Sequence, residues 1–347
     1  MDIVARGLAQ VGSESAPVYD VHAHTLPAAL LDVGARSGEP TYEVLEGADG
    51  LRLRIGERSV GPVPHALTDV AGRVAAMDRS GVDVQVLSPW LELYPEDLPA
   101  GAAANHARAV NDALAAEVRA LPDRLVGMAM VALQDAGEAA AELTRAVVDL
   151  GMCGAILPTA THTSELADPR LDPLWARAAQ HRALLMLHPF TPLSAPRLRA
   201  HGIGDALGTP LEGAVAVAAL LRAGVLDRHP GLRLCAVHGG GPLPAMAGRL
   251  DALWAFAGRP ASSAAPSDDL RRLYFDTLTH GDQALRWLWE FAGTDRLLLG
   301  SDYPFPTGEA DPVGRVDGLD AAGEVDRAAI RGGNVARLLA EVRRERP

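Results

Sequence analysis

Two histidines separated by one residue stand in the segment Val-Tyr-Asp-Val-His-Ala-His-Thr, which ends at Thr25. The β-branched and aromatic residues of this segment predict a β-strand, and side chains two positions apart on a strand point to the same face. The imidazoles of His22 and His24 are therefore expected to lie side by side. Two imidazoles so placed can bind one metal ion, each with a nitrogen about 2.1 Å from zinc. Because a short His-x-His pattern also occurs by chance, further ligands are needed to indicate a site.

Three more polar residues end apolar runs further along the chain. His188 ends Ala-Leu-Leu-Met-Leu-His, His238 ends Leu-Arg-Leu-Cys-Ala-Val-His, and Asp302 ends Arg-Leu-Leu-Leu-Gly-Ser-Asp. In proteins built from parallel strands and helices, catalytic side chains come from the carboxyl ends of the strands. We therefore expect these residues to converge with the histidine pair on one metal site. The alternative is that a backbone carbonyl simply satisfies each strand-end histidine.

The basic residues limit the chemistry that the chain can perform. All 32 residues counted as lysine or arginine are arginine. The absence of lysine excludes Schiff-base catalysis, a P-loop lysine and a carbamylated lysine that bridges two metals. It favours a single ion over a bridged pair. Histidine and carboxylate ligands suit zinc, and manganese, iron or cobalt are also compatible.

Short apolar runs alternate with alanine- and leucine-rich stretches along the whole chain. The sequence predicts strands at Val18–His24, Val82–Ser88, Arg124–Val131, Cys153–Leu157, Leu184–His188, Leu232–His238, Leu273–Asp276 and Arg296–Asp302. It predicts helices at Leu67–Ser80, Ala102–Ala120, Gly137–Leu150, Leu171–Gln180, Leu211–Ala223, Leu243–Ala255, Gln283–Phe291 and Val325–Val342. Continuous apolar strands are typical of parallel sheets covered on both faces. This alternation predicts one α/β domain over residues 1–347, folded as a (β/α)8 TIM barrel. A doubly wound open sheet is the alternative, because periodicity does not show closure.

An insertion of about Arg36 to Pro64 separates the first strand from its helix. Within it, Glu43–Ile55 alternates around Gly-Ala-Asp-Gly and predicts a small β-hairpin. Since it follows the first strand, we expect residues 36–64 to form a flap over the active site at the barrel mouth. Ala261–Asp268 is predicted to be a surface connection.

The composition is that of a globular protein, with 48% hydrophobic and 22% charged residues. The formal net charge of −12 argues against a nucleic-acid partner and against an anionic lipid surface. No apolar run approaches the ~20 residues of a membrane span, and the first twenty residues do not resemble a signal peptide. The two cysteines, Cys153 and Cys235, cannot form a disulfide framework, so a cytoplasmic location is expected. Both fall in predicted strands and are expected to pack rather than react.

The strand-end motifs together resemble the amidohydrolase superfamily, and within it the aminocarboxymuconate-semialdehyde decarboxylase-like branch of metal-dependent decarboxylases. The motifs are His-x-His at 22–24, His188-Pro189-Phe190, His238 with three glycines after it, and Gly-Ser-Asp-Tyr-Pro-Phe-Pro at 300–306. The similarity runs from about Tyr19 to Leu339. It implies a distorted (β/α)8 barrel that holds one divalent metal ion, usually zinc. It further implies a catalytic acid/base role for His238 and a set of four ligands, namely His22, His24, His188 and Asp302.

The resemblance also implies residues that bind a carboxylated substrate. Arg249 would bind a substrate carboxylate across a homodimer interface, a task that suits the guanidinium fork. The alternative for Arg249 is an ordinary charge on a helix surface. Phe190 is expected in the pocket wall or in the core. His162 follows the fourth strand and either reaches the substrate or lies on a surface loop. Asp276 ends the seventh strand and either lines the mouth or caps the backbone.

One departure from the branch concerns the substrate. In the named decarboxylase the flap carries a substrate-binding arginine just before a Pro-Val pair, whereas the matching stretch here begins at Gly61. This difference predicts a related but different carboxylated substrate. The hairpin offers three replacements, Arg52, Arg54 and Arg58, unless they form a solvated face.

We therefore predict an enzyme that decarboxylates an unsaturated or aromatic carboxylic acid, with His238 moving protons. The first alternative is a hydrolase of a lactone or amide, or a hydratase, that uses the same metal-bound water. The second alternative is a non-catalytic metal-binding barrel that serves as an interaction protein.

Overall fold

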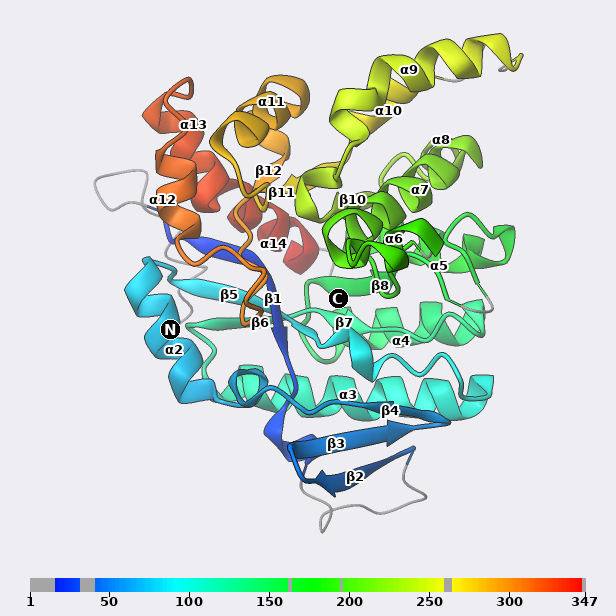
Figure 1. Ribbon diagram of the computed structural model, residues 1–347, viewed down its shortest axis with the longest axis vertical. Helices are drawn as coiled ribbons and strands as arrows, with labels where there is room; N and C mark the ends of the chain where they lie inside the picture. The colour runs from blue at the N-terminus through cyan, green and yellow to red at the C-terminus, as the bar shows by residue number, and fades with distance from the viewer. Residues whose placement is uncertain (1–15, 32–40, 162–163, 194–195, 259–263, 345–347) are drawn as a thin grey trace.

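Parallel strands alternate with helices, and most of the helices lie around the outside of the strands (Figure 1). The computed structural model describes residues 16–31, 41–161, 164–193, 196–258 and 264–344. The parallel strands are β1 (Tyr19–Thr25), β5 (Val84–Pro89), β6 (Leu125–Gly127), β7 (Ala129–Met130), β8 (Gly154–Pro158), β9 (Leu184–His188), β10 (Arg233–Ala236), β11 (Tyr274–Asp276) and β12 (Leu297–Leu298). They pair in the orders β1-β5-β6 and β12-β11-β10-β9-β8-β7. The predicted α/β class with parallel strands is confirmed. Strands β1, β5 and β8 are buried along their whole length, which explains their nearly continuous apolar sequence.

The predicted strand Arg124–Val131 is two strands, because the chain changes its hydrogen-bonding neighbour at Met128. Strand β6 pairs with β5, and β7 pairs with β8. Between them, the N–H of Met128 donates to the carbonyl of Leu87 (2.8 Å). A Cβ on Gly127 would stand 3.1 Å from the side chain of Met152, so glycine permits a close approach at this step.

Backbone hydrogen bonds also join β1 to the segment that follows β12. The N–H of Val21 donates to the carbonyl of Leu299 (2.8 Å), and the N–H of Asp302 donates to that of His22 (2.7 Å). The N–H of His24 donates to Tyr303 (2.7 Å). The backbone therefore fixes the position of Asp302 relative to the histidine pair.

The longer helices match the predicted ones within a few residues. They are α2 (Val70–Ser80), α3 (Ala100–Ala120), α4 (Ala136–Val148), α5 (Asp172–Gln180), α7 (Thr209–Arg222), α9 (Leu243–Phe256) and α11 (Asp282–Ala292). The carboxylates of Asp69 and Asp135 cap α2 and α4 by accepting from the N–H groups of Gly72 and Glu138. Helix α2 ends at Gly81, whose φ of 70° is the left-handed conformation that glycine adopts readily.

Shorter helices were missed by the sequence reasoning. They are α6 (Pro196–Ala200), α8 (Val225–Arg228), α10 (Pro266–Leu270) and α12 (Pro312–Asp317). Helices of four to six residues are too short to show a helical period in the sequence. Helix α10 overlaps the predicted connection Ala261–Asp268, of which residues 261–263 lie outside the described residues.

The predicted helix Val325–Val342 is interrupted. It consists of α13 (Glu324–Ala328), a wide helical turn at Ala329–Gly333, and α14 (Asn334–Arg344). A Cβ on Gly332 would stand 1.9 Å from the carbonyl oxygen of Pro17, which precedes β1. This close approach of the helix to the start of β1 accounts for the irregular turn.

The expectation that no apolar run is long enough to span a membrane is wrong for one helical stretch. The turn Gly204–Gly208 continues into α7, and Gly204–Arg222 is long and apolar enough to cross a membrane by length and composition alone. In this structure, Val217 and Leu220 of α7 pack into the core. A core helix meets the same criterion, so this single segment does not indicate a membrane protein.

The insertion contains three antiparallel strands. They are β2 (Tyr42–Gly47), β3 (Gly50–Ile55) and β4 (Arg58–Val60), and β3 pairs with both of the others. This small sheet lies beside α3 (Figure 1). The first two strands occupy the stretch predicted as a hairpin, and Leu53 and Ile55 are fully buried in the core.

Both cysteines are free and buried. Burial raises the pKa of the Cys235 thiol well above its usual value, and the nearby Asp276 carboxylate adds to this effect. A thiol that stays protonated is a poor nucleophile, so Cys235 packs as a small apolar residue.

Candidate metal centre

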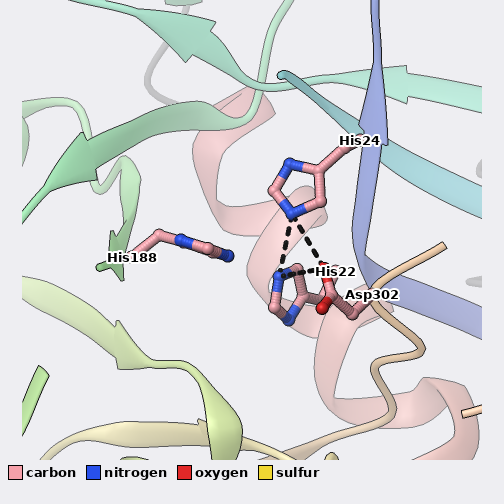
Figure 2. Close-up of side chains that lie close together, drawn as sticks. All are labelled: His22, His24, His188 and Asp302. Carbon is pink, nitrogen blue, oxygen red and sulfur yellow. Dashed lines mark hydrogen bonds and ion pairs between the residues drawn. The ribbon is translucent and has the colours of Figure 1, made fainter. Parts of the chain in front are cut away.

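Four of the predicted site residues lie together at the carboxyl ends of their strands (Figure 2). His22 and His24 come from β1, His188 is the last residue of β9, and Asp302 follows β12. One ligand atom from each of the four lies within 4.8 Å of the other three. Residues 280 positions apart in the chain therefore meet at one point, as the strand-end pattern predicts.

The contacts within this cluster are short. Nε2 of His22 lies 3.1 Å from Nε2 of His24, and the same two atoms lie 3.3 Å and 3.1 Å from Oδ1 of Asp302. The ring of His188 meets those of His22 and His24 edge to face, with centroids 5.1 Å and 5.0 Å away. Three imidazoles and one carboxylate thus face a common centre.

The other ring nitrogen of each histidine in the cluster is occupied. Nδ1 of His22 lies 2.7 Å from Oδ2 of Asp276, and Nδ1 of His24 lies 3.1 Å from Oγ of Ser88. Nδ1 of His188 donates to the carbonyl of Pro189 (2.8 Å). The Asp276 carboxylate and the Pro189 carbonyl can only accept, and the Ser88 hydroxyl donates to the carbonyl of Ala23 (3.2 Å), which leaves its oxygen to accept from His24. Each Nδ1 therefore carries the proton, and the lone pair is on Nε2. All three lone pairs are therefore available at the common centre.

The cluster fits a divalent metal ion. Nε2 of His188 is buried and has no hydrogen-bond partner, although a buried polar atom without a partner is costly. The facing Nε2 atoms of His22 and His24 are both acceptors in the tautomers described above, so they cannot satisfy each other. A cation at the centre would satisfy all of these atoms. Three nitrogen ligands and one oxygen ligand are a set that zinc and related divalent ions accept.

Burial and the Asp302 carboxylate dominate the electrostatics of the cluster. Burial lowers the pKa of His188 well below its usual value, and the neighbouring histidines lower it further. Burial also lowers the pKa of His24, more than Asp302 raises it. Burial alone would lower the pKa of His22, but the carboxylates of Asp302 and Asp276 raise it. Burial would raise the pKa of Asp302, but the surrounding histidines hold it below the usual range. An ionised carboxylate among mostly neutral imidazoles is the state that binds metal.

His238 lies beside the cluster on a tight turn. Its ring centroid is 5.2 Å from that of His188 and 5.6 Å from that of His22. Burial lowers its pKa to about 4, and the proximity of His22 lowers it in the same direction. His238 has a φ of 56°, which is uncommon for a residue with a side chain.

The three glycines after His238 allow this turn. Gly239, Gly240 and Gly241 all have positive φ. A Cβ on Gly240 would stand 2.6 Å from the ring of Phe275, and one on Gly241 would stand 2.6 Å from the carbonyl oxygen of Pro210. The glycines thus let the chain turn tightly beside the site, as their sequence position indicates.

Asp276 and Asp20 support the cluster, and the sequence reasoning assigned no such role to either. Asp276 accepts the N–H of Gly239 (2.7 Å) with one carboxylate oxygen and contacts His22 with the other. It therefore caps the backbone and orients a predicted ligand at the same time. Asp20 is fully buried and accepts both the N–H (2.9 Å) and the Oγ–H (2.6 Å) of Ser301. The position of Asp276 at the end of β11 could have indicated a role at the site. Nothing in the sequence indicates that Asp20 contacts Ser301.

A cavity of about 970 Å³ opens next to the cluster. His188, His238 and Asp302 form one part of its wall. Helices α9 and α11 and the turn at Gly204–Gly208 contribute to the rest, together with the start of α7 and the loops that follow β10, β11 and β12. The volume lies at the upper end of the range for small-molecule sites.

The predicted substrate-binding residues are not brought together in the same way. Arg249 is exposed on α9 and is not among the described residues that line this cavity. Phe190 lies under the guanidinium of Arg58 (5.0 Å to the ring centroid) and next to the ring of Tyr94. His162 lies outside the described residues. In the insertion, Arg52 pairs with Asp49, and the guanidinium of Arg54 pairs with Glu43. Both arginines therefore belong to a solvated face of the hairpin, which was the alternative to binding the substrate.

Comparison with known proteins identifies the family. The family model described as Amidohydrolase matches residues 19–340. The chain belongs to this amidohydrolase family. The resemblance to the aminocarboxymuconate-semialdehyde decarboxylase-like branch is also confirmed, because relatives of that name match most of the chain.

Curated relatives of this amidohydrolase include two kinds of decarboxylase. A 2-amino-3-carboxymuconate-6-semialdehyde decarboxylase from Dictyostelium discoideum is 26% identical over 332 residues, covering 92% of this chain and 90% of the relative. A gamma-resorcylate decarboxylase from Rhodococcus jostii is 31% identical over 255 residues, covering 67% and 76%. Among solved structures, that of 5-carboxyvanillate decarboxylase from Sphingomonas paucimobilis matches with a TM-score of 0.77 and 25% identity, covering 93% of this chain and 99% of the other.

Proposed function

We propose that this amidohydrolase is a metal-dependent decarboxylase, a carbon–carbon lyase that acts on an unsaturated or aromatic carboxylic acid. The observation that carries the proposal is the convergence of three imidazoles and one carboxylate beside a cavity whose wall includes His188, Asp302 and His238. The decarboxylases among the relatives support this reaction over hydrolysis or hydration.

In this proposal, four residues hold one divalent ion: His22, His24, His188 and Asp302. When bound, the ion supplies a Lewis acid for a substrate oxygen. We propose zinc, because three imidazoles and one carboxylate suit it, with manganese, iron or cobalt as the alternatives. Metal analysis of the purified protein, followed by reloading of the chelated protein with each ion, distinguishes among them.

His238 moves the proton in the proposed reaction. The bond between the substrate carbon and its carboxylate breaks, the electron pair stays on the carbon, and that carbon takes up one proton, so the products are CO₂ and the decarboxylated compound. The His238 imidazole is mostly neutral at neutral pH, since burial lowers its pKa to about 4. It therefore accepts a proton from a substrate hydroxyl or from water and passes it to the carbon.

The test is CO₂ release from a panel of phenolic and unsaturated acids, measured with the wild type and with His238→Asn. The variant is expected to lose about 10²–10⁴-fold in kcat, as removal of a general acid–base does, with its metal content unchanged. His65→Asn is the matched control, because the His65 side chain is 86% exposed. If His238→Asn keeps its metal and its full turnover, the assigned role is wrong. If no acid releases CO₂ but a lactone or amide is hydrolysed, the hydrolase alternative replaces the decarboxylase.

We also propose that the two parallel sheets form one closed (β/α)8 barrel and that residues 1–347 are a single domain. The hydrogen bonds between β1 and the segment after β12, and the one between Met128 and Leu87, support closure at both ends of the sheets. The insertion would lie near the mouth of the barrel. The contact between Arg58 of β4 and Phe190, two residues beyond His188, supports this placement. A cytoplasmic location remains part of the proposal, supported by the two free, buried cysteines.

Arg249 is proposed to bind the substrate carboxylate from the second subunit of a homodimer. It is exposed on α9 among the apolar side chains of Met246 and Leu253, and Phe256 near the helix end is 91% exposed. Light scattering after size-exclusion chromatography is expected to give a dimer, and Arg249→Ala is expected to raise KM more than it lowers kcat. A monomer that is fully active would contradict this part of the proposal. Phe190 would contribute to the pocket wall.

A further inference from the structure

One face of helix α11 is apolar, and only part of it packs into the core: Leu288 is buried and Phe291 packs against the core, whereas Ala284 is exposed. Ala284, Trp287, Leu288 and Phe291 are spaced i, i+3, i+4 and i+7, which places them on one side of the helix. All four line the large cavity, and Trp287 is 62% exposed. We call these four residues the α11 face.

The α11 face is continuous with the proposed reaction site. A Cβ on Gly239 would stand 3.3 Å from a methyl group of Leu288, so this side chain packs against the residue that follows His238. The same cavity is bounded by His188 and Asp302. The cavity therefore has room for a molecule that reaches from the metal cluster to the α11 face.

The charges around the cavity indicate what part of a substrate suits this region. None of the described residues that line it is an arginine, and the chain has no lysine. Arg271 stacks on Phe291 (4.8 Å to the centroid), but it pairs with Asp268 and is not among the lining residues. Asp205 lies in the wall. Among the described lining residues of one chain, a second carboxylate here would find no cation and would face a like charge, whereas an apolar group would gain burial.

We propose that the α11 face binds an apolar substituent on the ring of an aromatic monocarboxylic acid, so that the preferred substrate is an alkyl- or aryl-extended aromatic acid and not a dicarboxylate. The inference rests on the proposed decarboxylase function and specifies its substrate class. The α11 face determines specificity and takes no part in the breaking of the bond.

The first experiment compares matched acids with the metal-loaded full-length protein. Decarboxylation kinetics are measured for 2,4-dihydroxybenzoates that carry hydrogen, methyl, pentyl or a second carboxylate at ring position 6. Each buried methylene is expected to raise kcat/KM by about fourfold, so pentyl, with four more methylenes than methyl, should exceed it by up to about 250-fold. The dicarboxylate is expected to be the poorest substrate. If it is turned over as well as the pentyl compound, the substrate class is wrong while the decarboxylase proposal stands. If none of the four acids releases CO₂, the decarboxylase proposal itself is contradicted, and the inference about substrate class falls with it.

The second experiment places a charge on the α11 face. Ala284→Arg puts a guanidinium on it, and Gln283→Arg puts the same group on the same helix at an exposed residue that does not line the cavity. The first variant is expected to reduce the advantage of pentyl over methyl to about twofold or less and to improve the dicarboxylate, while the second keeps the wild-type preference. Sedimentation of both variants is measured in parallel. If Ala284→Arg changes the association state and leaves the dependence on chain length intact, the α11 face is a contact between copies and the inference is overturned.

Discussion

The carboxylate of Asp276 lies 2.7 Å from Nδ1 of His22 and, through its other oxygen, 2.7 Å from the backbone nitrogen of Gly239. One buried side chain therefore connects a proposed metal ligand on β1 with the turn that carries His238. Because the hydrogen bond at Nδ1 keeps the lone pair on Nε2, Asp276 couples the geometry of the metal cluster to that of the proposed acid/base.

Replacement of Asp276 with asparagine is expected to weaken metal binding by about 10–100-fold, the usual effect of removing the partner of a ligating histidine. The amide has nearly the same shape but no charge, so it holds the His22 tautomer less firmly. The measurement is a competitive titration against a chelator of known affinity. Asp295→Asn is the control, because the Asp295 side chain is 77% exposed. Equal affinities for the two variants would show that Asp276 serves only as a backbone cap.

Comparison of Gly240 with Gly258 distinguishes the cost of a left-handed backbone from the cost of a steric clash when a side chain is added. Gly240 and Gly258 have similar φ values of 72° and 76°, but a Cβ meets the Phe275 ring at 2.6 Å in the first case and nothing within 4 Å in the second. Gly258→Ala is expected to cost about 1 kcal/mol of unfolding free energy for the left-handed backbone alone. Gly240→Ala is expected to cost at least about 2 kcal/mol more, because the ring must move in a packed core. Urea denaturation of both variants measures the difference, and equal losses would show that the core around Phe275 adapts freely.

The sequence was sufficient to predict which residues meet at the metal cluster. His22 and His24 share a strand face, and His188 and Asp302 end apolar runs, so the parallel arrangement of the strands brings them to one edge. These predictions need only the local period and the direction of each strand.

The contacts that support the cluster could not be predicted in this way. The pairs Asp276–His22 and Asp20–Ser301 join residues 254 and 281 positions apart, and they depend on the exact register of neighbouring strands. The break in the C-terminal helix depends on a close approach between Gly332 and Pro17, which no local pattern encodes. The proposed role of Arg249 involves a second copy of the chain, whose position no local pattern encodes.

Arg73 is expected to be essential for stability although it is far from any proposed ligand in sequence. Its guanidinium is fully buried and donates to the carbonyl of His24 (2.7 Å) and to Oε1 of Gln85 (3.1 Å), whose amide in turn donates to Asp20 (2.9 Å). Arg73→Met would leave the buried carbonyl oxygens of His24 and Gln85 without their donor, at a cost of about 1–3 kcal/mol for each. Arg79→Met, at an exposed position on the same helix, is expected to change stability by no more than about 0.5 kcal/mol. Chemical denaturation of the metal-free proteins tests both values, and a small loss for Arg73→Met would mean that water replaces the guanidinium.

The buried imidazole of His238 makes the stability of the metal-free protein depend on pH. Its pKa is about 4 in the folded protein and about 6.5 when the chain is unfolded, so between these values the unfolded state binds a proton that the folded state does not. The free energy of unfolding should therefore fall as the pH is lowered from about 6.5 to 4, by up to about 1.4 kcal/mol per pH unit from this group. His238→Asn removes this titration, so its stability should fall less steeply over the same window. His65→Asn, at a side chain that is 86% exposed, is the control for the substitution itself. Urea denaturation at pH 6.5, 5.5 and 4.5 in the presence of chelator measures the slopes, and parallel curves for all three proteins would mean that water reaches His238 in the folded state.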